Sequence, residues 1–151
     1  MEIKTLSYSK NRKEIIQKCA EFFADELNLK NSTYKVFICT DPTLMRERRN
    51  NGVACKTGDK EITIAVDSRL PIKKLFYTLA HEMVHAKQFA RGQYRSEKAR
   101  NGKYRRYWCG KRIVADYVDQ PWEIEAFSRE SILVERLLSV LTKNMKKEQM
   151  S

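Results

Sequence analysis

The spacing of apolar residues along the first seventy positions predicts one helix followed by strands. Residues 10–29 carry apolar side chains near helical spacing, so we expect an amphipathic helix there. Residues 31–40 alternate apolar and polar positions, and residues 61–68 do so most clearly, as half-buried strands do. Between them, residues 41–60 have turn signals at both ends, which predicts a loop with a short strand near 53–56.

The rest of the chain is predicted to form two longer helices joined by an irregular connection. Pro71 suits the first turn of a helix, where its missing N–H is not needed, and this helix is expected to reach about residue 90. Three glycines, at positions 92, 102 and 110, then interrupt a basic, aromatic-rich stretch. Pro121 begins a last helix that runs to about residue 145. We therefore expect an α+β fold with an N-terminal helix, a small, mostly antiparallel sheet and two further helices.

Length and composition favour one soluble domain. The 151 residues suit a single domain over 1–151, and 32% of them are charged. No apolar run approaches the ~20 residues that cross a bilayer, and the first residues lack the apolar core of a signal peptide. The four cysteines are far apart and form no C-x-x-C pair, so we expect free thiols in a cytoplasmic protein with no membrane partner.

The positive charge is concentrated in one stretch. The net charge is +11, and residues 87–112 contain ten basic residues but a single acidic one, Glu97. Such a field favours an anionic partner such as nucleic acid, with Tyr104, Tyr107 and Trp108 available to stack on bases. A solvated loop whose aromatic residues pack over the core is the alternative interpretation.

The strongest chemical signal is the pair of histidines in "TLAHEMVHAKQF". His81 and His85 are the only histidines in the chain, and Glu82 directly follows the first. At about 100° per residue both imidazoles project from one helical face, away from the main apolar stripe and on the same arc as Gln88. Two imidazoles placed in this way can bind one Zn²⁺, and Glu82 beside the open position can then act as general base and general acid.

A catalytic zinc ion normally has three protein ligands, so a third must come from elsewhere in the chain. Glu123 and Glu125 begin the last helix and lie about 200° apart, so only one of them can face the metal. Five apolar residues share the arc of Glu123, which predicts that Glu123 is buried and Glu125 faces solvent: Phe127, Val134, Leu137, Leu138 and Leu141. Glu130 also lies near this arc, either as the ligand itself or as a partner that hydrogen-bonds a ligand.

The motifs "TLAHEMVHAKQFARGQ", "YWCGK" and "PWEIEAF" together resemble small zincin-type metallopeptidases, often encoded by bacteriophages and grouped with the SprT-like proteins. The resemblance covers about residues 61–130. It implies a zincin-like fold whose edge strand, expected at 61–68, pairs with an extended peptide substrate. It also implies Glu123 as the head of an E-x-x-A pattern. Tyr117 or a nearby tyrosine could stabilise the oxyanion.

The chain differs from SprT-like proteins in having no third histidine and no zinc ribbon. The leading hypothesis is a zinc endopeptidase of peptide or protein substrates, with one Zn²⁺ held by His81, His85 and Glu123 and with Glu82 as the catalytic residue. It would act in the host cytoplasm if the gene belongs to a bacteriophage. The alternative is a nucleic-acid-binding protein that uses residues 87–112 and whose metal site is structural or relict.

Overall fold

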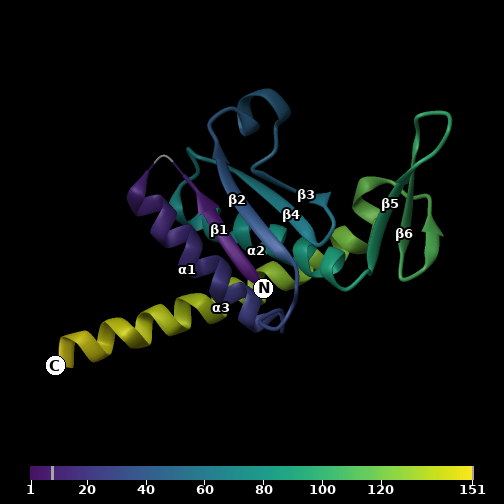
Figure 1. Ribbon diagram of the computed structural model, residues 1–151. Coiled ribbons are helices and arrows are strands. Elements are labelled where there is room, and N and C mark those ends of the chain that lie inside the picture. The colour runs from purple at the N-terminus through teal and green to yellow at the C-terminus, as the bar shows by residue number, and fades with distance from the viewer. Residues whose placement is uncertain (8, 151) are drawn as a thin grey trace.

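A computed structural model describes residues 1–7 and 9–150 (Figure 1). The chain forms a four-stranded sheet, three long helices and a separate three-stranded sheet, so the expected α+β class is confirmed. The first sheet contains β1 (Glu2–Leu6), β2 (Lys35–Asp41), β4 (Glu61–Asp67) and β3 (Gly52–Gly58), in that order. No helix in these residues is both long enough and apolar enough to traverse a lipid bilayer.

The helices lie near their predicted positions. Helix α1 (Lys10–Glu26) begins after Ser9, whose side chain accepts a hydrogen bond from the Arg12 N–H. Helix α2 (Ile72–Ala90) follows Pro71, and α3 (Pro121–Met150) extends beyond the expected end. The apolar faces of these helices and of β2 and β4 form one core on one side of the sheet. Its fully buried residues include Phe23, Ile38, Ile64 and Leu79.

The prediction of a mostly antiparallel sheet is wrong for the four-stranded sheet. Strands β1, β2 and β4 are mutually parallel, and β3 alone runs antiparallel, to β4. The parallel arrangement arises because α1 returns the chain from β1 to the start of β2. Strand β1 itself was not expected, since only Thr5 is buried among its five residues.

The edge strand is also not the predicted one. Residues 61–68 contain β4, which lies inside the sheet between β2 and β3. Its apolar side chains point into the core that the helices form with the sheet, and Ile62, Ile64 and Val66 are fully inaccessible to solvent. The edge beside α2 is β3, which begins after the π-helical turn η1 (Leu44–Arg48) and includes the short strand expected near 53–56. One backbone edge of β3 is therefore free to pair with another chain.

The basic connection is ordered rather than irregular. It forms β5 (Tyr94–Lys98), β6 (Tyr104–Trp108) and β7 (Lys111–Ile113), an antiparallel sheet that stands at the side of the molecule opposite the C-terminus (Figure 1). A 3₁₀ turn, η2 (Tyr117–Asp119), then leads into α3. The four cysteines are free thiols, as expected.

Candidate metal centre

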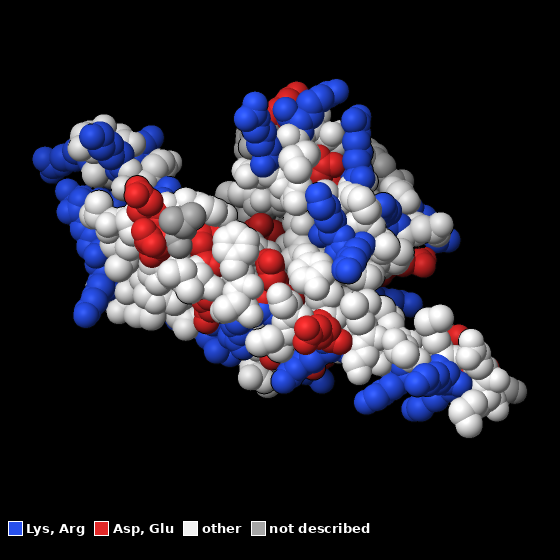
Figure 2. Space-filling model, turned by 180° about the vertical axis from the view of Figure 1, so that it is seen from behind, with Lys and Arg blue, Asp and Glu red and all other residues white. Residues whose placement is uncertain are grey.

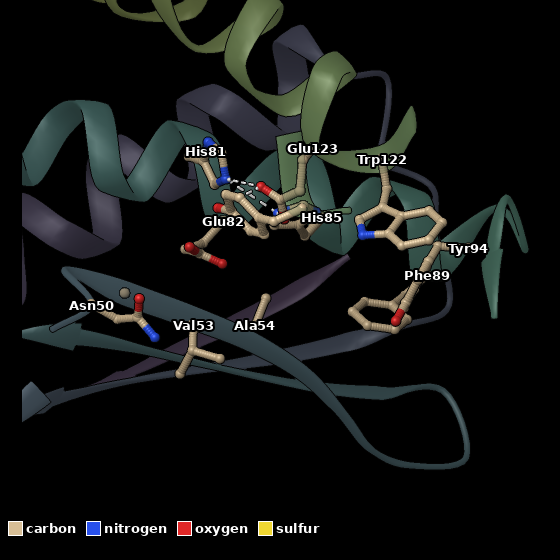
Figure 3. A pocket seen from close by; sticks show the side chains of 12 residues that line it. Asn50, Val53, Ala54, His81, Glu82, His85, Phe89, Tyr94, Trp122 and Glu123 are labelled. Atoms are coloured by element: carbon tan, nitrogen blue, oxygen red, sulfur yellow. Dashed lines mark hydrogen bonds and ion pairs between the residues drawn. The ribbon is translucent and has the colours of Figure 1, made fainter. Parts of the chain in front are cut away.

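Two elements distant in sequence bring the candidate ligands together. His81 and His85 lie on consecutive turns of α2, and Glu123 lies in the first turn of α3, which packs against α2 (Figure 3). His81 is 9% exposed and Glu123 is 8% exposed. The predicted burial of Glu123 is therefore confirmed, and three side chains that usually seek water share a largely dry site.

The facing atoms of these three residues are separated by about the distance that one metal ion requires. The Nε2 atoms of His81 and His85 are 3.2 Å apart. Glu123 places Oε2 3.1 Å from the His81 nitrogen and Oε1 2.8 Å from the His85 nitrogen. Tetrahedral ligands of zinc, each at about 2.0–2.1 Å from the ion, would lie roughly 3.3 Å apart. The group formed by His81, His85 and Glu123 can thus hold a metal ion after small outward shifts.

The opposite ring nitrogen of each histidine has its own partner. His81 Nδ1 lies 2.8 Å from Glu130 Oε2, and His85 Nδ1 lies 2.8 Å from Gln88 Oε1. Because a carboxylate and an amide oxygen only accept, both Nδ1 atoms donate. Each ring therefore keeps Nε2 for the metal. Glu130 was predicted to be either a metal ligand or a hydrogen-bonding partner of a ligand. The geometry favours the second role, in which it orients His81.

The orientation of Gln88 is fixed by a buried network between α2 and α3. Its Nε2 donates to the Trp122 carbonyl and to Glu125 Oε1, at 2.9 Å in each case, which leaves only Oε1 to face His85. Lys87, 2% exposed, donates from Nζ to Glu125 Oε2 at 2.7 Å. The prediction that Glu125 faces solvent is wrong, because Lys87 also turns inward and needs an anion there. These bonds hold the pKa of Glu125 below its ordinary value despite its partial burial.

Glu82 faces the cleft but does not contact the candidate ligand atoms. It is 6% exposed and lies opposite the start of β3 (Figure 3). Burial raises its pKa, although the neighbouring histidines oppose that rise. Gly52 allows this close approach, because a Cβ atom there would stand 2.7 Å from Thr78 Cγ2 and 3.2 Å from Glu82 Cγ. The site thus holds a carboxylate whose affinity for a proton is increased, beside the metal position.

Tyr117 reaches the centre from η2. Its hydroxyl donates to Glu123 Oε2 at 3.0 Å, and the residue is otherwise 57% exposed. Partial burial and the negative charge of Glu123 raise its pKa to about 12. The phenol therefore remains protonated at neutral pH and can donate a hydrogen bond to a group in the cleft.

The charges within the centre depend on one another. Burial by itself would lower the pKa of His81, but hydrogen bonds to Glu123 and Glu130 raise it to about 9. His85 is shifted in the same direction, chiefly by Glu123, against its burial. The two histidines in turn hold the pKa of Glu123 far below its ordinary value, although burial acts in the opposite sense. Without a metal ion, the positive charge of the imidazolium rings compensates the buried carboxylate. A bound cation can take the place of that positive charge.

A cavity of about 200 Å³ opens in front of the ligands, between β3 and the two helices. Gly52, Val53 and Ala54 form one wall, and the ligand side chains form the opposite wall (Figure 3). Phe89, Tyr94 and Trp122 close the end toward β5. An extended chain lying along β3 would pass directly beneath the metal position.

The sequence predicted the three candidate ligands and the place of Glu82 beside them, but not the residues that hold them in position. The part played by Gln88 was signalled only by its place on the histidine arc, three residues after His85. Neither Lys87 nor Gly52 was singled out, because their roles depend on contacts with α3 and α2. Phe127 was expected to be buried, but it is 51% exposed, and its ring lies edge-on against His81 with centroids 4.7 Å apart.

Comparisons with known proteins add no assignment: no protein-family model, curated protein or solved structure matches the chain.

Proposed function

We propose that the protein is a zinc-dependent endopeptidase with a zincin-like site. In this proposal His81, His85 and Glu123 hold one Zn²⁺, and Glu82 is the general base and then the general acid. The observation that carries it is the convergence of two Nε2 atoms and a buried carboxylate next to an uncoordinated glutamate. Membership of the zincins, and of the SprT-like group in particular, stays a prediction from the sequence motifs.

The donor set favours zinc as the metal. Two imidazoles and one carboxylate are typical of catalytic zinc sites, in which a fourth position remains open. Magnesium and calcium prefer oxygen ligands and would make little use of two nitrogens. A bound zinc ion would polarise a peptide carbonyl and make an attacking water more acidic.

The chain's own residues then account for the movement of the proton. Glu82, with its raised pKa and its position beside the open cavity, takes a proton from the attacking water. It passes that proton to the leaving amine when the peptide bond breaks. Tyr117, held protonated, can turn its hydroxyl from Glu123 toward the substrate oxygen, where negative charge develops. The free edge of β3 offers backbone groups that align the peptide.

The experiment that tests this proposal is the substitution Glu82→Gln. We expect zinc content to stay unchanged, because Glu82 does not contact the ligand atoms, and cleavage of unfolded protein substrates to fall about 10²–10⁴-fold. The matched control is Glu135→Gln, on the exposed face of α3, which should leave both quantities unchanged. Equal cleavage by Glu82→Gln and the unaltered protein would contradict the assigned role.

We propose nucleic-acid binding as a second candidate function, since β5–β7 present a basic surface. The pairing register places Arg95, Tyr107 and Arg112 side by side on one face, with Arg105 beside them. The three arginines are exposed, and Arg95 stacks on the Tyr107 ring at 4.2 Å. Lysine and arginine side chains stand out on this end of the molecule (Figure 2, left). Lys87, the first residue of the basic stretch, is not part of this surface, because it is buried and paired with Glu125.

This second candidate is tested by measuring binding to single-stranded DNA over a range of salt concentrations. If the surface binds phosphates, changing Arg105 and Arg112 together to alanine should lower the salt slope by about 2. A matched change of Lys146 and Lys147, on the exposed end of α3, should leave the slope unaltered. A slope that both double variants change equally would show that net charge, rather than this surface, governs binding.

A further inference from the structure

A second and larger cavity adjoins the candidate metal cleft on the side of β5. Its volume is about 570 Å³, and it lies between the edge strand β3 and the β5–β6 hairpin. Ala54, Phe89 and Tyr94 line both this cavity and the cleft in front of the candidate metal ligands, so the two spaces adjoin each other. A chain that passes the metal position along β3 therefore reaches the second cavity without leaving the strand.

The walls of this cavity are aromatic. Tyr34, Phe89, Tyr94 and Tyr104 supply four rings, and the Phe89 and Tyr94 rings meet edge to face with centroids 5.3 Å apart. The space between them is large enough for a bulky side chain. Aromatic walls of this kind favour a flat apolar group through edge-to-face and stacked contacts.

The rim of the cavity is cationic. Lys56 and Arg95 line it, and none of the Asp or Glu residues that the structure describes does. Arg95 is already engaged by Glu97 and by the Tyr107 ring. Lys56, exposed near the end of β3, has no ion pair within the described part of the chain, so its ammonium group is available to a ligand. An acidic group carried next to the aromatic one would complement this rim.

We propose that this cavity is the specificity pocket of the protein and that it receives an aromatic side chain from an acidic segment of the substrate. The proposal rests on the peptidase function proposed above and adds the substrate class. Successive residues of an extended chain advance by about 3.3 Å and alternate in direction. Because Ala54 belongs to both spaces, the aromatic residue lies about two residues or fewer from the bond that is cut.

Peptide binding tests the pocket separately from catalysis. The zinc-loaded Glu82→Gln variant is titrated with three labelled peptides, and fluorescence anisotropy reports their affinities. The first carries one phenylalanine flanked by glutamates, the second replaces phenylalanine with alanine, and the third replaces the glutamates with lysines. We expect the first peptide to bind at least about 10-fold more tightly than either of the others.

Two pairs of variants locate the binding. Ser96→Trp, added to the Glu82→Gln protein, fills the cavity from β5 and should abolish the preference for phenylalanine, whereas Ser139→Trp on exposed α3 should not. Lys56→Glu should remove the preference for glutamate, whereas Lys98→Glu, exposed on β5 but outside the cavity, should preserve it. The lysine pair is informative even if the added tryptophan perturbs the β5–β6 hairpin.

The outcomes separate this inference from the proposed function. Equal affinity for the three peptides, or preferences that survive both Ser96→Trp and Lys56→Glu, would overturn the pocket whether or not the unaltered protein cleaves. Selective binding of the first peptide without cleavage by the unaltered protein would support the pocket and count against the peptidase. Selective binding together with cleavage beside the phenylalanine would support both.

Discussion

At the scale of single residues, the two ligand histidines are oriented by different acceptors. His81 donates to a carboxylate, Glu130, whereas His85 donates to the amide oxygen of Gln88. The amide cannot rotate, because its nitrogen is bound to the Trp122 carbonyl and to Glu125. Gln88 thus links the tautomer of His85 to the packing of α2 against α3.

Gln88→Leu tests that coupling. Leucine has a similar size but no acceptor, so His85 can rotate or change tautomer. We expect zinc affinity to fall about 10–100-fold, measured by competition with a chelator. Gln149→Leu, at the exposed end of α3, is the matched control and should bind zinc as the unaltered protein does. Unchanged affinity in Gln88→Leu would show that Gln88 has no part in orienting the ligand.

The shifted pKa values predict how stability depends on pH. The pKa of His81 is raised from 6.5 to about 9, so its contribution is complete below pH 6.5 and is lost as pH rises toward 9. The pKa of Glu123 is lowered from 4.5, so its contribution is present above that pH and is lost on acidification. The centre therefore stabilises the metal-free protein most between pH 4.5 and 6.5.

Zinc should offset the loss of stability at alkaline pH, because it binds neutral imidazoles and displaces their protons. We expect the increase in Tm on adding zinc to be small at about pH 5.5 and largest near pH 9. Thermal unfolding with and without zinc across this range measures the difference. An increase in Tm that does not depend on pH would exclude a site made from these histidines.

The ligands could be predicted from the sequence, whereas their supports could not. Helical geometry places His81 and His85 on one face, and the arc of Glu123 predicted the carboxylate that lies beside them. The Lys87–Glu125 pair was missed because helical periodicity ranks a lysine and a glutamate as solvent-facing. Only the packing of α2 against α3 shows that each side chain supplies the other's counter-charge.

At the scale of elements, β3 is the edge strand that lines the candidate site. The alternation of apolar and polar positions predicted which side chains within 61–68 are buried. It carries no information on the order of strands in the sheet. Pairing of β4 with both β2 and β3 places it inside the sheet and leaves β3 beside α2. The β5–β7 sheet was missed for a related reason: its strands are joined mainly by backbone pairing and bury few apolar side chains.

Gly52→Ala tests the close contact between β3 and α2. The added methyl group would lie 2.7 Å from Thr78 Cγ2, so the strand or the helix must move. We expect a loss of about 1–3 kcal/mol in the free energy of unfolding, together with lower activity because Glu82 is displaced. Gly58→Ala, where the new atom would lie 3.3 Å from Glu61 Oε2 and 3.5 Å from Glu61 Cβ, is the matched control. Equal stability of the two variants, in urea denaturation, would contradict the contact.

At the scale of the whole molecule, an acidic centre lies within a strongly basic protein. The net charge is +11, yet Glu82, Glu123 and Glu130 gather around one pair of imidazoles. Among the described residues, no Lys or Arg lines the cavity in front of the candidate ligands, whereas Arg49 lines the neighbouring one. If the proposed function holds, we expect the basic surface to attract acidic substrates and the acidic centre to attract a cation.

The last helix shows where whole-molecule geometry overrides periodicity. Leu138 and Leu141 share the arc of Glu123 and were expected to be buried, but they are 40% and 41% exposed. Their part of α3 extends past α1 and α2, and its C-terminus stands away from the body (Figure 1). A periodic apolar face predicts which side of a helix would be buried, but not where its neighbours end.

X-ray absorption at the zinc edge, on protein loaded with one equivalent of zinc, tests the central claim most directly. The spectrum should show two histidine nitrogens and carboxylate or water oxygens at about 2.0–2.1 Å, and Glu123→Ala should change the oxygen shell. Failure to retain zinc, or a shell of sulfur atoms near about 2.3 Å from the free cysteines, would contradict it.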